Sequence, residues 1–368
     1  MFLMAAQVMQ LPDVAEHFKG NAFWDAVAFH TSHVAWTGCS LHDLIQPSFS
    51  FMVGVALPFS LAARMSRGAS TSSLWSHALL RAVILVMLGV ALRSMGKPQT
   101  NWTFEDTLSQ IGLGYPFLFA LGFAAMRLRW LTFAVILAGY WLLFALYSGT
   151  STGPVPKDWT HHFTGFAANW NLNANAAWAF DTWFMNLFPR VKEFTGNSGG
   201  YSTLNFIPTL ATMLLGLIAG QWIKDGPRDA ALCKRLAIAG AISLAVGYAW
   251  HISGLCPSVK KIWTPSWVLV SGGWCFLLMA AFLWIIDVRG FQRWASPLVI
   301  IGMNSIAIYI MSWTMDGFFG EMLTTHLGKA PFLILGPAFE PMLHGVGILL
   351  IYWLILWWMY RNKVFIRI

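Results

Sequence analysis

Residues 30–61 read HTSHVAWTGCSLHDLIQPSFSFMVGVALPFSL, and this stretch decides the fold. Its second half is long and apolar enough to cross a bilayer, because a membrane helix needs about 20 apolar residues. Its first half places four ionisable side chains against the start of that span: His30, His33, His42 and Asp43. Such groups are costly at the edge of a membrane helix unless water, a partner or a substrate meets them. The pattern therefore predicts a functional site.

The composition of the whole chain agrees with a membrane protein. Of 368 residues, 57% are hydrophobic and only 10% are charged, with a mean hydropathy of +0.60. Soluble domains carry about 25% charged residues. The 21 Trp and 28 Phe fit membrane helices with aromatic belts at the interfaces. We therefore predict an all-α, polytopic integral membrane protein. The net charge of +8 is better explained by membrane orientation than by nucleic-acid binding, which is not expected.

Hydropathy predicts about nine full transmembrane helices, preceded by an apolar stub over residues 1–9 that reads as a truncated first helix. We expect one transmembrane helical bundle, residues 1–368 forming a single transmembrane domain with an outward-facing loop insertion at about 149–203. The predicted spans are 44–63, 77–95, 107–125, 130–148, 204–223, 232–251, 264–287, 297–318 and 342–360.

The distribution of Lys and Arg predicts the orientation. If the stub leaves the cytoplasm, the inner segments hold more Lys and Arg than the outer ones, although the outer loops are longer. The positive-inside rule then predicts a cytoplasmic C-terminus and an outward-facing segment 30–43. Cys39 and Cys256 would share the outer side, where a disulfide is one option and two separate small apolar cysteines the other. The cysteine spacings give no zinc motif, so no metal is expected.

The long segment 149–203 is rich in Trp, Asn, Gly and Pro. A loop with so many aromatic residues favours an ordered lid over a linker. Trp and Asn also suit a sugar-binding surface, with ring faces for stacking and amides for hydroxyl groups. An aromatic belt on the membrane interface is an equal alternative. His162, in this loop, could reach over the site and contact the substrate.

His33 is the leading candidate for chemistry in the first motif. An imidazole titrates near neutrality, so it can act as a general base or as a nucleophile. Asp43 could orient it and stabilise its charged form. His30, at helical spacing from His33, and His42 are expected to support substrate binding. The alternative is a set of interfacial residues solvated by headgroup water, but the clustering of so many polar groups favours a site.

Two further polar groups interrupt apolar stretches. Asn304 and Ser305 lie in LVIIGMNSIAIYIM, and a buried amide in a bilayer must find a partner. Asn304 therefore faces a cavity or makes a structural bond between helices; both remain open. Gln110, near the start of the predicted span 107–125, could line the same cavity.

The first motif also resembles a known family. It follows H-x2-W-x-G-x4-D-L-x2-P-x-F-x-F-x2-G from His33 through Trp36, Gly38 and Asp43 to Gly54. This resembles the heparan-alpha-glucosaminide N-acetyltransferase family of transmembrane acyltransferases. Three later stretches match in the same order, so that the likeness covers nearly the whole chain: 204–220, the segment GMNSI at 302–306, and YRNKVFIRI at 360–368.

The resemblance implies acetyl transfer across a membrane from cytosolic acetyl-CoA to a glucosamine amine on the far side. It implies that His33 is the catalytic histidine, with Asp43 as its orienting carboxylate. Asn304 and Ser305 would contact acetyl-CoA, and Trp36 would help to bind the acceptor. We expect a bacterial-type homologue in the inner (cytoplasmic) membrane, acting on an amino sugar or glycan at the periplasmic side. Expected partners are membrane lipids and that acceptor, with a homodimer as one option.

The chain departs from the family pattern at three places. The N-terminal S-L-D-x-x-R-G type of motif is absent, Gln7 is nearest to the position of a functional Asn, and residues 106–110 lack the family's Arg. Two other functions therefore stay open. One is a transporter or flippase for a lipid-linked sugar, which would show inverted repeats or broken helices. The other is a non-catalytic membrane scaffold.

Overall fold

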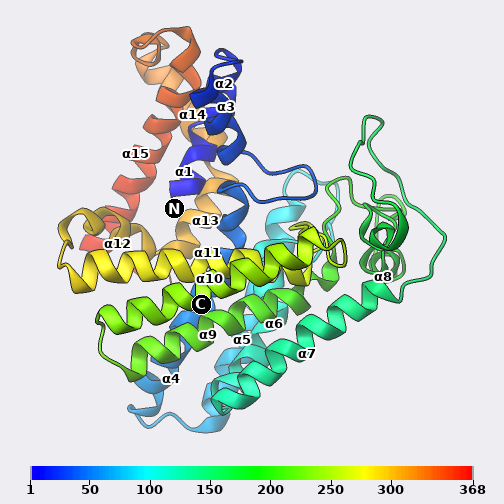
Figure 1. The fold of residues 1–368 in the computed structure, drawn as a ribbon. Coiled ribbons are helices and arrows are strands. Elements are labelled where there is room, and N and C mark those ends of the chain that lie inside the picture. The colour runs from blue at the N-terminus through cyan, green and yellow to red at the C-terminus, as the bar shows by residue number, and fades with distance from the viewer. Residues whose placement is uncertain (1, 367–368) are drawn as a thin grey trace. The chain divides into compact units, whose positions relative to one another are not determined.

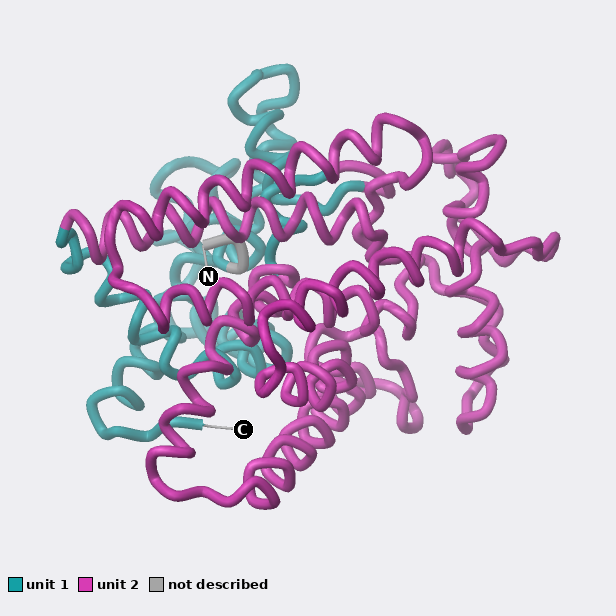
Figure 2. The backbone as a smooth tube through the Cα atoms, turned by 60° about the horizontal axis from the view of Figure 1, so that its bottom comes forward, with its two compact units in different colours: residues 1–34, 39–45, 290–368 teal, residues 35–38, 46–289 magenta. Residues whose placement is uncertain are grey.

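The structure is a computed structural model that describes residues 2–366. Within them it is helical, and the only strand-like pairing is one isolated bridge between Thr37 and Val259. The chain forms two compact units (Figure 2). Unit 1 comprises the described parts of Met1–Val34, Cys39–Ile45 and Gly290–Ile368, and unit 2 comprises Ala35–Gly38 and Gln46–Arg289. The predicted single domain stays a prediction.

Seven helices in residues 2–366 are long and apolar enough to cross a membrane, which confirms an all-helical protein with multiple candidate spans. They are labelled in Figure 1 and comprise α4 (Ile45–Met65), α5 (Thr71–Ser94), α7 (Met126–Ala145), α9 (Phe206–Asp225), α10 (Ala230–Ile252), α11 (Pro265–Leu283) and α15 (Glu340–Arg361).

Two of the nine predicted spans differ from the expectation. The predicted span 107–125 is α6 (Thr107–Gly122), whose 16 residues rise about 24 Å, less than the roughly 30 Å hydrocarbon core. The predicted span 297–318 is broken into α12 (Ser296–Gly302) and α13 (Ser305–Thr314), which are bent by 67°. The structure thus supports seven spans, or eight if the bent pair counts as one, in place of nine.

The N-terminal segment folds into three short helices: α1 (Phe2–Val8), α2 (Leu11–Glu16) and α3 (Ala22–Thr31). Gln10 joins the first two in a left-handed conformation, with φ at 49°, and ends the apolar run of the predicted stub. The side chain of Asn21 accepts hydrogen bonds from the backbone of Phe23 and Trp24 and so caps α3. Segment 10–43 therefore holds helical structure that hydropathy did not predict.

Unit 2 is built around α9, of which 78% of the apolar window is buried. A helix that is apolar on all sides belongs in the interior of a bundle. Its Gly216 and Gly220 form a G-x-x-x-G pattern that lets another backbone approach closely. A Cβ atom at Gly216 would overlap the carbonyl oxygen of Phe51, and one at Gly54 would overlap that of Met213. The glycines of two sequence motifs thus meet where α4 crosses α9.

The loop 149–203 belongs to unit 2. It contains α8 (Ala176–Phe184) beyond the end of α7 (Figure 1). Trp36 and Trp170 are fully buried in a cluster with Tyr140 and Phe144 of α7. Trp36 donates its indole N–H to the backbone oxygen of Trp170, at 3.1 Å, and so fixes the loop. Cys256 is a buried free thiol, so it forms no disulfide with Cys39.

Unit 1 packs its helices against α15. Tyr352 and Leu356 of α15 are buried with Phe319 and Leu323 of α14 (Asp316–Leu327). A Cβ atom at Gly345 would overlap the backbone oxygen of Val8, so α1 lies directly against the N-terminal part of α15. These contacts place the N-terminal helices beside the C-terminal ones, far apart in sequence.

Candidate active site

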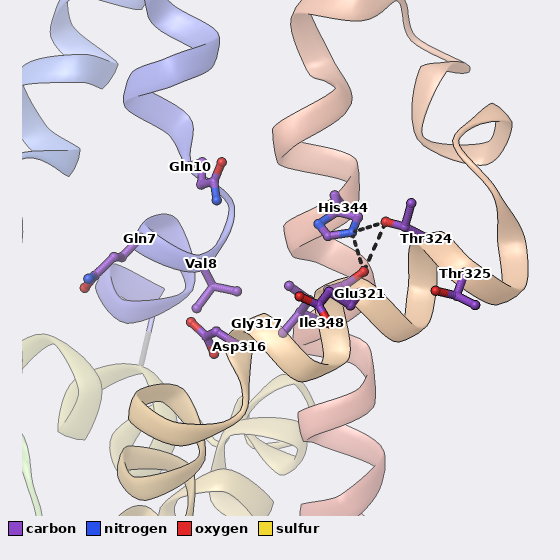
Figure 3. A pocket seen from close by; sticks show the side chains of 11 residues that line it. Gln7, Val8, Gln10, Asp316, Gly317, Glu321, Thr324, Thr325, His344 and Ile348 are labelled. Atoms are coloured by element: carbon purple, nitrogen blue, oxygen red, sulfur yellow. Dashed lines mark hydrogen bonds between the residues drawn. The ribbon is translucent and has the colours of Figure 1, made fainter. Parts of the chain in front are cut away.

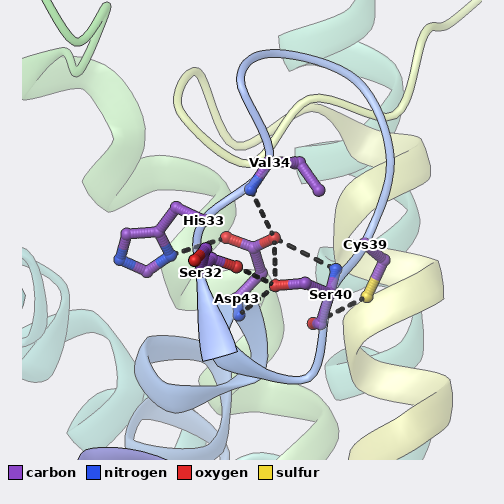
Figure 4. Close-up of polar contacts among 6 residues, drawn as sticks. All are labelled: Ser32, His33, Val34, Cys39, Ser40 and Asp43. Atoms are coloured by element: carbon purple, nitrogen blue, oxygen red, sulfur yellow. Dashed lines mark hydrogen bonds and ion pairs between the residues drawn. The ribbon is translucent and has the colours of Figure 1, made fainter. Parts of the chain in front are cut away.

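His33 and Asp43 form a hydrogen-bonded pair within unit 1. Nδ1 of His33 lies 2.8 Å from Oδ1 of Asp43 (Figure 4). The Asp43 side chain is fully buried, whereas that of His33 is 43% exposed. When Nδ1–H donates to the carboxylate, the lone pair of the neutral ring lies on Nε2, the nitrogen on the side away from Asp43. The arrangement suits a histidine that takes a proton from outside.

Asp43 is held in place by the residues that precede it. Its Oδ2 accepts hydrogen bonds from the backbone N–H groups of Val34, at 3.3 Å, and Ser40, at 3.1 Å. The hydroxyl oxygen of Ser40 is 3.0 Å from the same Oδ2 and 2.6 Å from the backbone oxygen of Ser32. These contacts offset the cost of burying a carboxylate and fix its orientation toward His33.

Ser40 is a site residue that our sequence analysis did not single out, although a signal was present. Its hydroxyl accepts from the backbone N–H of Asp43, and Asp43 accepts from the backbone N–H of Ser40. This reciprocal pair is a capping box, here with Asp in the place of Glu, and it precedes the 3-10 turn His42–Leu44 that leads into α4. The S-x-x-D spacing before an apolar run predicts it.

The other two histidines of the motif differ in position. His42 is buried, and its ring lies 4.4 Å from that of His33, tilted by 55°. It therefore packs against the catalytic candidate. His30 is exposed in the last turn of α3, with its ring against that of Phe29. The structure thus brings His33, His42 and Asp43 together, and leaves His30 outside this cluster.

Unit 1 also contains an open groove of about 850 Å³ (Figure 3). It lies between the turn that joins α1 to α2 and the helices α14 and α15, and its lining is mostly polar. The side chains that could bind a ligand are two carboxylates, two amides, two hydroxyls and one imidazole: Asp316, Glu321, Gln7, Gln10, Thr324, Thr325 and His344. The lining includes neither Lys nor Arg.

Two residues of this groove are held by further contacts. Nε2 of His344 is 3.0 Å from the backbone oxygen of Gly320 and 3.2 Å from the hydroxyl of Thr324. Asp316 accepts a hydrogen bond from the Tyr352 hydroxyl, which fixes its carboxylate at the start of α14. Of this lining, only Gln7 could be picked out from the sequence, because the acidic and histidine side chains lie on separate helices without a shared motif.

Asn304 and Ser305 lie at the bend between α12 and α13. The Asn304 amide donates to the backbone oxygen of Val364, at 3.1 Å, and its oxygen accepts from the backbone N–H of Ile366, at 3.0 Å. Asn304 thus binds the C-terminal segment, while Ser305 is half-buried as the first residue of α13. Their assignment to acetyl-CoA stays a prediction. Arg367 and Ile368, at the end of the 360–368 motif, lie outside the described residues.

Three of the expected substrate-binding residues belong to unit 2. Trp36 is buried and binds Trp170, as described above. Gln110 is buried, and its amide nitrogen donates to the backbone oxygens of Phe104, at 2.6 Å, and Ser202, at 3.2 Å. His162 is exposed on the long loop. Trp36 and Gln110 therefore use polar atoms to hold the loop, and their role in substrate binding stays a prediction.

A buried acidic cluster joins this loop to the segment before α6. Burial raises the pKa of Glu105 to about 7, against the opposing effect of Arg93, 3.7 Å away. Burial also raises the pKa of Asp181 to about 6, although its carboxylate accepts a 2.9 Å hydrogen bond from the backbone of Thr203. Glu105 accepts a hydrogen bond from Asn197 of the same loop. Protonation near neutral pH can therefore change how tightly the loop is held.

Fold and site together define an integral membrane protein of many helices with a histidine–carboxylate pair suited to proton transfer. No family model matches the chain. Two curated relatives do: the heparan-alpha-glucosaminide N-acetyltransferase of human, 22% identical over 343 residues, and that of mouse, 22% identical over 350 residues. Each alignment covers 82% of this chain and 51% of the relative. The chain is a distant homologue of heparan-alpha-glucosaminide N-acetyltransferase, and it spans about half the length of the curated relatives it matches.

Proposed function

We propose that this protein is a membrane acetyltransferase in which His33 removes the proton of the acceptor. The observation that carries the proposal is the 2.8 Å hydrogen bond between His33 and Asp43. The Asp43 side chain is fully buried, and two backbone N–H groups hold its other carboxylate oxygen. A carboxylate so placed keeps the imidazole in one tautomer and stabilises its protonated form. The distant homology to an N-acetyltransferase supports the same class of reaction.

The role of His33 follows from its two nitrogens. Nδ1 is engaged by Asp43, so Nε2 accepts the proton of the acceptor amine or hydroxyl as that atom attacks the acetyl carbonyl carbon. Acetyl-CoA, when bound, supplies that carbonyl as a thioester. The proton held on Nε2 can then pass to the departing thiolate. A covalent route, in which Nε2 itself carries the acetyl group first, uses the same geometry.

The groove of unit 1 supports an amino sugar as the acceptor. Its hydroxyls, amides and imidazole suit the hydroxyl groups of a sugar, and Asp316 and Glu321 suit a protonated amine. Without Lys or Arg in its lining, the groove is a poor fit for the phosphate groups of coenzyme A. We therefore assign the groove to the acceptor and not to acetyl-CoA.

We further propose the inner membrane of a bacterium as the location, with His33 facing outward and the C-terminus in the cytoplasm. The placement of Lys and Arg supports this orientation. His344 lies in the second turn of α15, whose start would then be at the outer face, as would His33 before α4. Both groups would thus meet an acceptor from the same side. Lipid contacts and a homodimer stay predictions.

The test is acetyl transfer by the purified full chain in proteoliposomes. Radiolabelled acetyl-CoA is the donor, and glucosamine and N-acetylglucosamine are offered separately as acceptors. His33→Ala should lower transfer by at least about 10²-fold, the lower end for general-base catalysis. His17→Ala, at an exposed histidine that bonds the backbone oxygen of Asp13 in the N-terminal segment, is the matched control. Equal rates for His33→Ala and the unaltered chain would contradict the proposal.

A transporter for a lipid-linked sugar is the second candidate, favoured by the 67° bend between α12 and α13. Transporters often build their substrate sites from such discontinuous helices. Within residues 2–366 this is the only broken pair of candidate spans, whereas an inverted repeat would supply two. Sugar movement across liposomes without acetyl transfer would favour this function. Binding of coenzyme A separates the enzyme from both the transporter and a scaffold.

A further inference from the structure

Unit 2 contains a second pocket, at the end of α4 that is remote in sequence from Asp43. Its charged side chains are arginines, whereas those of the groove in unit 1 are carboxylates. A cavity of about 20 Å³ lies between α4, α5 and α6. Its polar lining consists of Ser60, Arg64, His77, Arg81 and Tyr115. Tyr115 is buried and Arg81 half-buried, so they form the floor, whereas the exposed His77 lies at the mouth. The volume admits about one water-sized group.

Arg81 is an unusual residue for its position. It lies ten residues beyond Thr71, the start of α5, and inside that candidate span. An arginine within a membrane helix is costly and by default marks a function. Its guanidinium lies 4.7 Å from the ring centre of Tyr115 and donates to the Tyr115 hydroxyl, at 3.3 Å.

One hydrogen-bond donor of this pocket has no partner. Nε of Arg81 is buried and has no hydrogen-bond partner. Arg64 donates to Nε2 of His77, at 2.8 Å, so that nitrogen carries a lone pair and the imidazole is neutral. Both guanidinium charges therefore remain, one at the mouth and one on the floor, and a buried donor without a partner is destabilising.

The surrounding helices supply no counter-charge. Residues 44–104, which include α4, α5 and the turn between them, contain no Asp or Glu, and neither does α6. Neither Arg64 nor Arg81 forms an ion pair with a carboxylate in the part of the chain that the structure describes. Two arginines that face a common cavity without a carboxylate make a site for an external anion.

We propose that this pocket binds a phosphate group. Arginine donors match phosphate oxygens in geometry and charge, and a phosphate oxygen fits the narrow floor while the rest of the ligand stays at the mouth. Positive-inside placement puts the Arg64 end of α4 in the cytoplasm, where two sources of this chemistry exist. One is a soluble phosphate ester such as the nucleotide part of coenzyme A, and the other is the headgroup of an anionic phospholipid. The proposal does not rest on acetyl transfer.

The experiment measures binding to the purified full chain in uncharged detergent. One arm titrates coenzyme A and, separately, pantetheine, which lacks the phosphates. The other arm adds mixed micelles with phosphatidylglycerol or, as the neutral lipid, phosphatidylcholine. The variants are Arg81→Gln, the mouth variant Arg64→Gln in case the first does not fold, and Arg81→Lys, which keeps the charge. Arg67→Gln is the matched control, since Arg67 is exposed in the same turn and bonds only the backbone of Ala63.

Binding in one arm should weaken about tenfold or more in Arg81→Gln and Arg64→Gln, remain in Arg67→Gln, and recover in part in Arg81→Lys. Loss of coenzyme A binding, with no effect on pantetheine, identifies a soluble phosphate ester. Loss of the preference for phosphatidylglycerol identifies a headgroup. If neither ligand binds, or if the folded glutamine variants bind both as well as the unaltered chain does, the proposal is wrong.

Discussion

A Cβ atom at Gly216 would overlap the backbone carbonyl oxygen of Phe51, so α9 and α4 touch backbone to backbone. Gly220 has the same relation to Val55 one turn later. These contacts fix α9 against the helix whose first turn follows Asp43 in sequence. The two glycines of the L-G-x2-A-G motif are therefore needed for packing rather than for chemistry.

Substitution of Gly216 by Leu should prevent folding, because no flexible side chain can move aside for the new atoms. The opposing atom is backbone, and overpacking of this kind costs well over the usual 1–3 kcal/mol. Gly139→Ala in α7 is the control, since a Cβ atom there has nothing within 4 Å. Yield of monodisperse protein and helical content by circular dichroism are the measurements. Normal yield of Gly216→Leu would contradict the packing described.

Asp43→Asn should lower acetyl transfer by about 10²–10⁴-fold while the protein still folds. An amide can offer its N–H to Nδ1 of His33, which favours the tautomer with the proton on Nε2 and removes the base. The measurement is kcat as a function of pH, with helical content as the check on folding. An unchanged kcat would show that the His33–Asp43 bond has no part in the reaction.

Ser40→Ala should weaken the support of Asp43 without removing the pair. One hydroxyl contact to Oδ2 is lost, worth about 1 kcal/mol, so kcat should fall by roughly three- to tenfold. Ser40→Thr retains the hydroxyl and should restore most of the activity. A purely structural role would lower thermal stability but leave the pH profile of kcat unmoved, and a shift of that profile is the result that we expect.

The contact between His33 and Asp43 was easier to predict from the sequence than the arrangement of the chain around it. His33 and Asp43 lie ten positions apart in one motif, so a local pattern was enough to pair them. Hydropathy predicted the seven spans that the structure supports, but it did not predict the bend at Gly302–Asn304. A break in the backbone leaves the composition of the segment unchanged. The groove was missed because its side chains come from α1, the turn after it, and the C-terminal helices α14 and α15, which are far from α1 in the sequence.

Trp36 and Gln110 show a second limit of prediction from the sequence. The sequence predicts binding roles for both, yet the Trp36 indole donates to the backbone oxygen of Trp170, and the Gln110 amide nitrogen donates to those of Phe104 and Ser202. Ser202 lies 92 residues from Gln110 in the sequence, and Trp170 lies 134 residues from Trp36. A single sequence cannot show which long-range carbonyl a buried donor will find.

Glu321→Gln should raise KM for an amino-sugar acceptor by several-fold and leave kcat nearly unchanged. Glu321 is exposed on the groove, and its charge would attract a protonated amine mainly by long-range electrostatics, which salt screens. The difference between variant and unaltered chain should therefore shrink at high ionic strength. Glu340→Gln, at the start of α15 and outside the groove lining, is the control. A salt-independent effect would contradict an electrostatic role.

The stability of the loop 149–203 should fall as pH rises from about 5 to 8. The pKa of Glu105 is about 7 in the folded chain against an ordinary 4.5, so the folded state holds a proton that the unfolded chain releases within this range. Asp181, with a pKa of about 6 raised from 3.8, acts in the same direction. Differential scanning fluorimetry in detergent should give a lower melting temperature at pH 8 than at pH 5. Glu105→Gln should flatten this dependence, whereas Glu193→Gln, exposed in the same loop, should leave it intact. A melting temperature that rises with pH would show that Arg93, and not burial, determines the titration of Glu105.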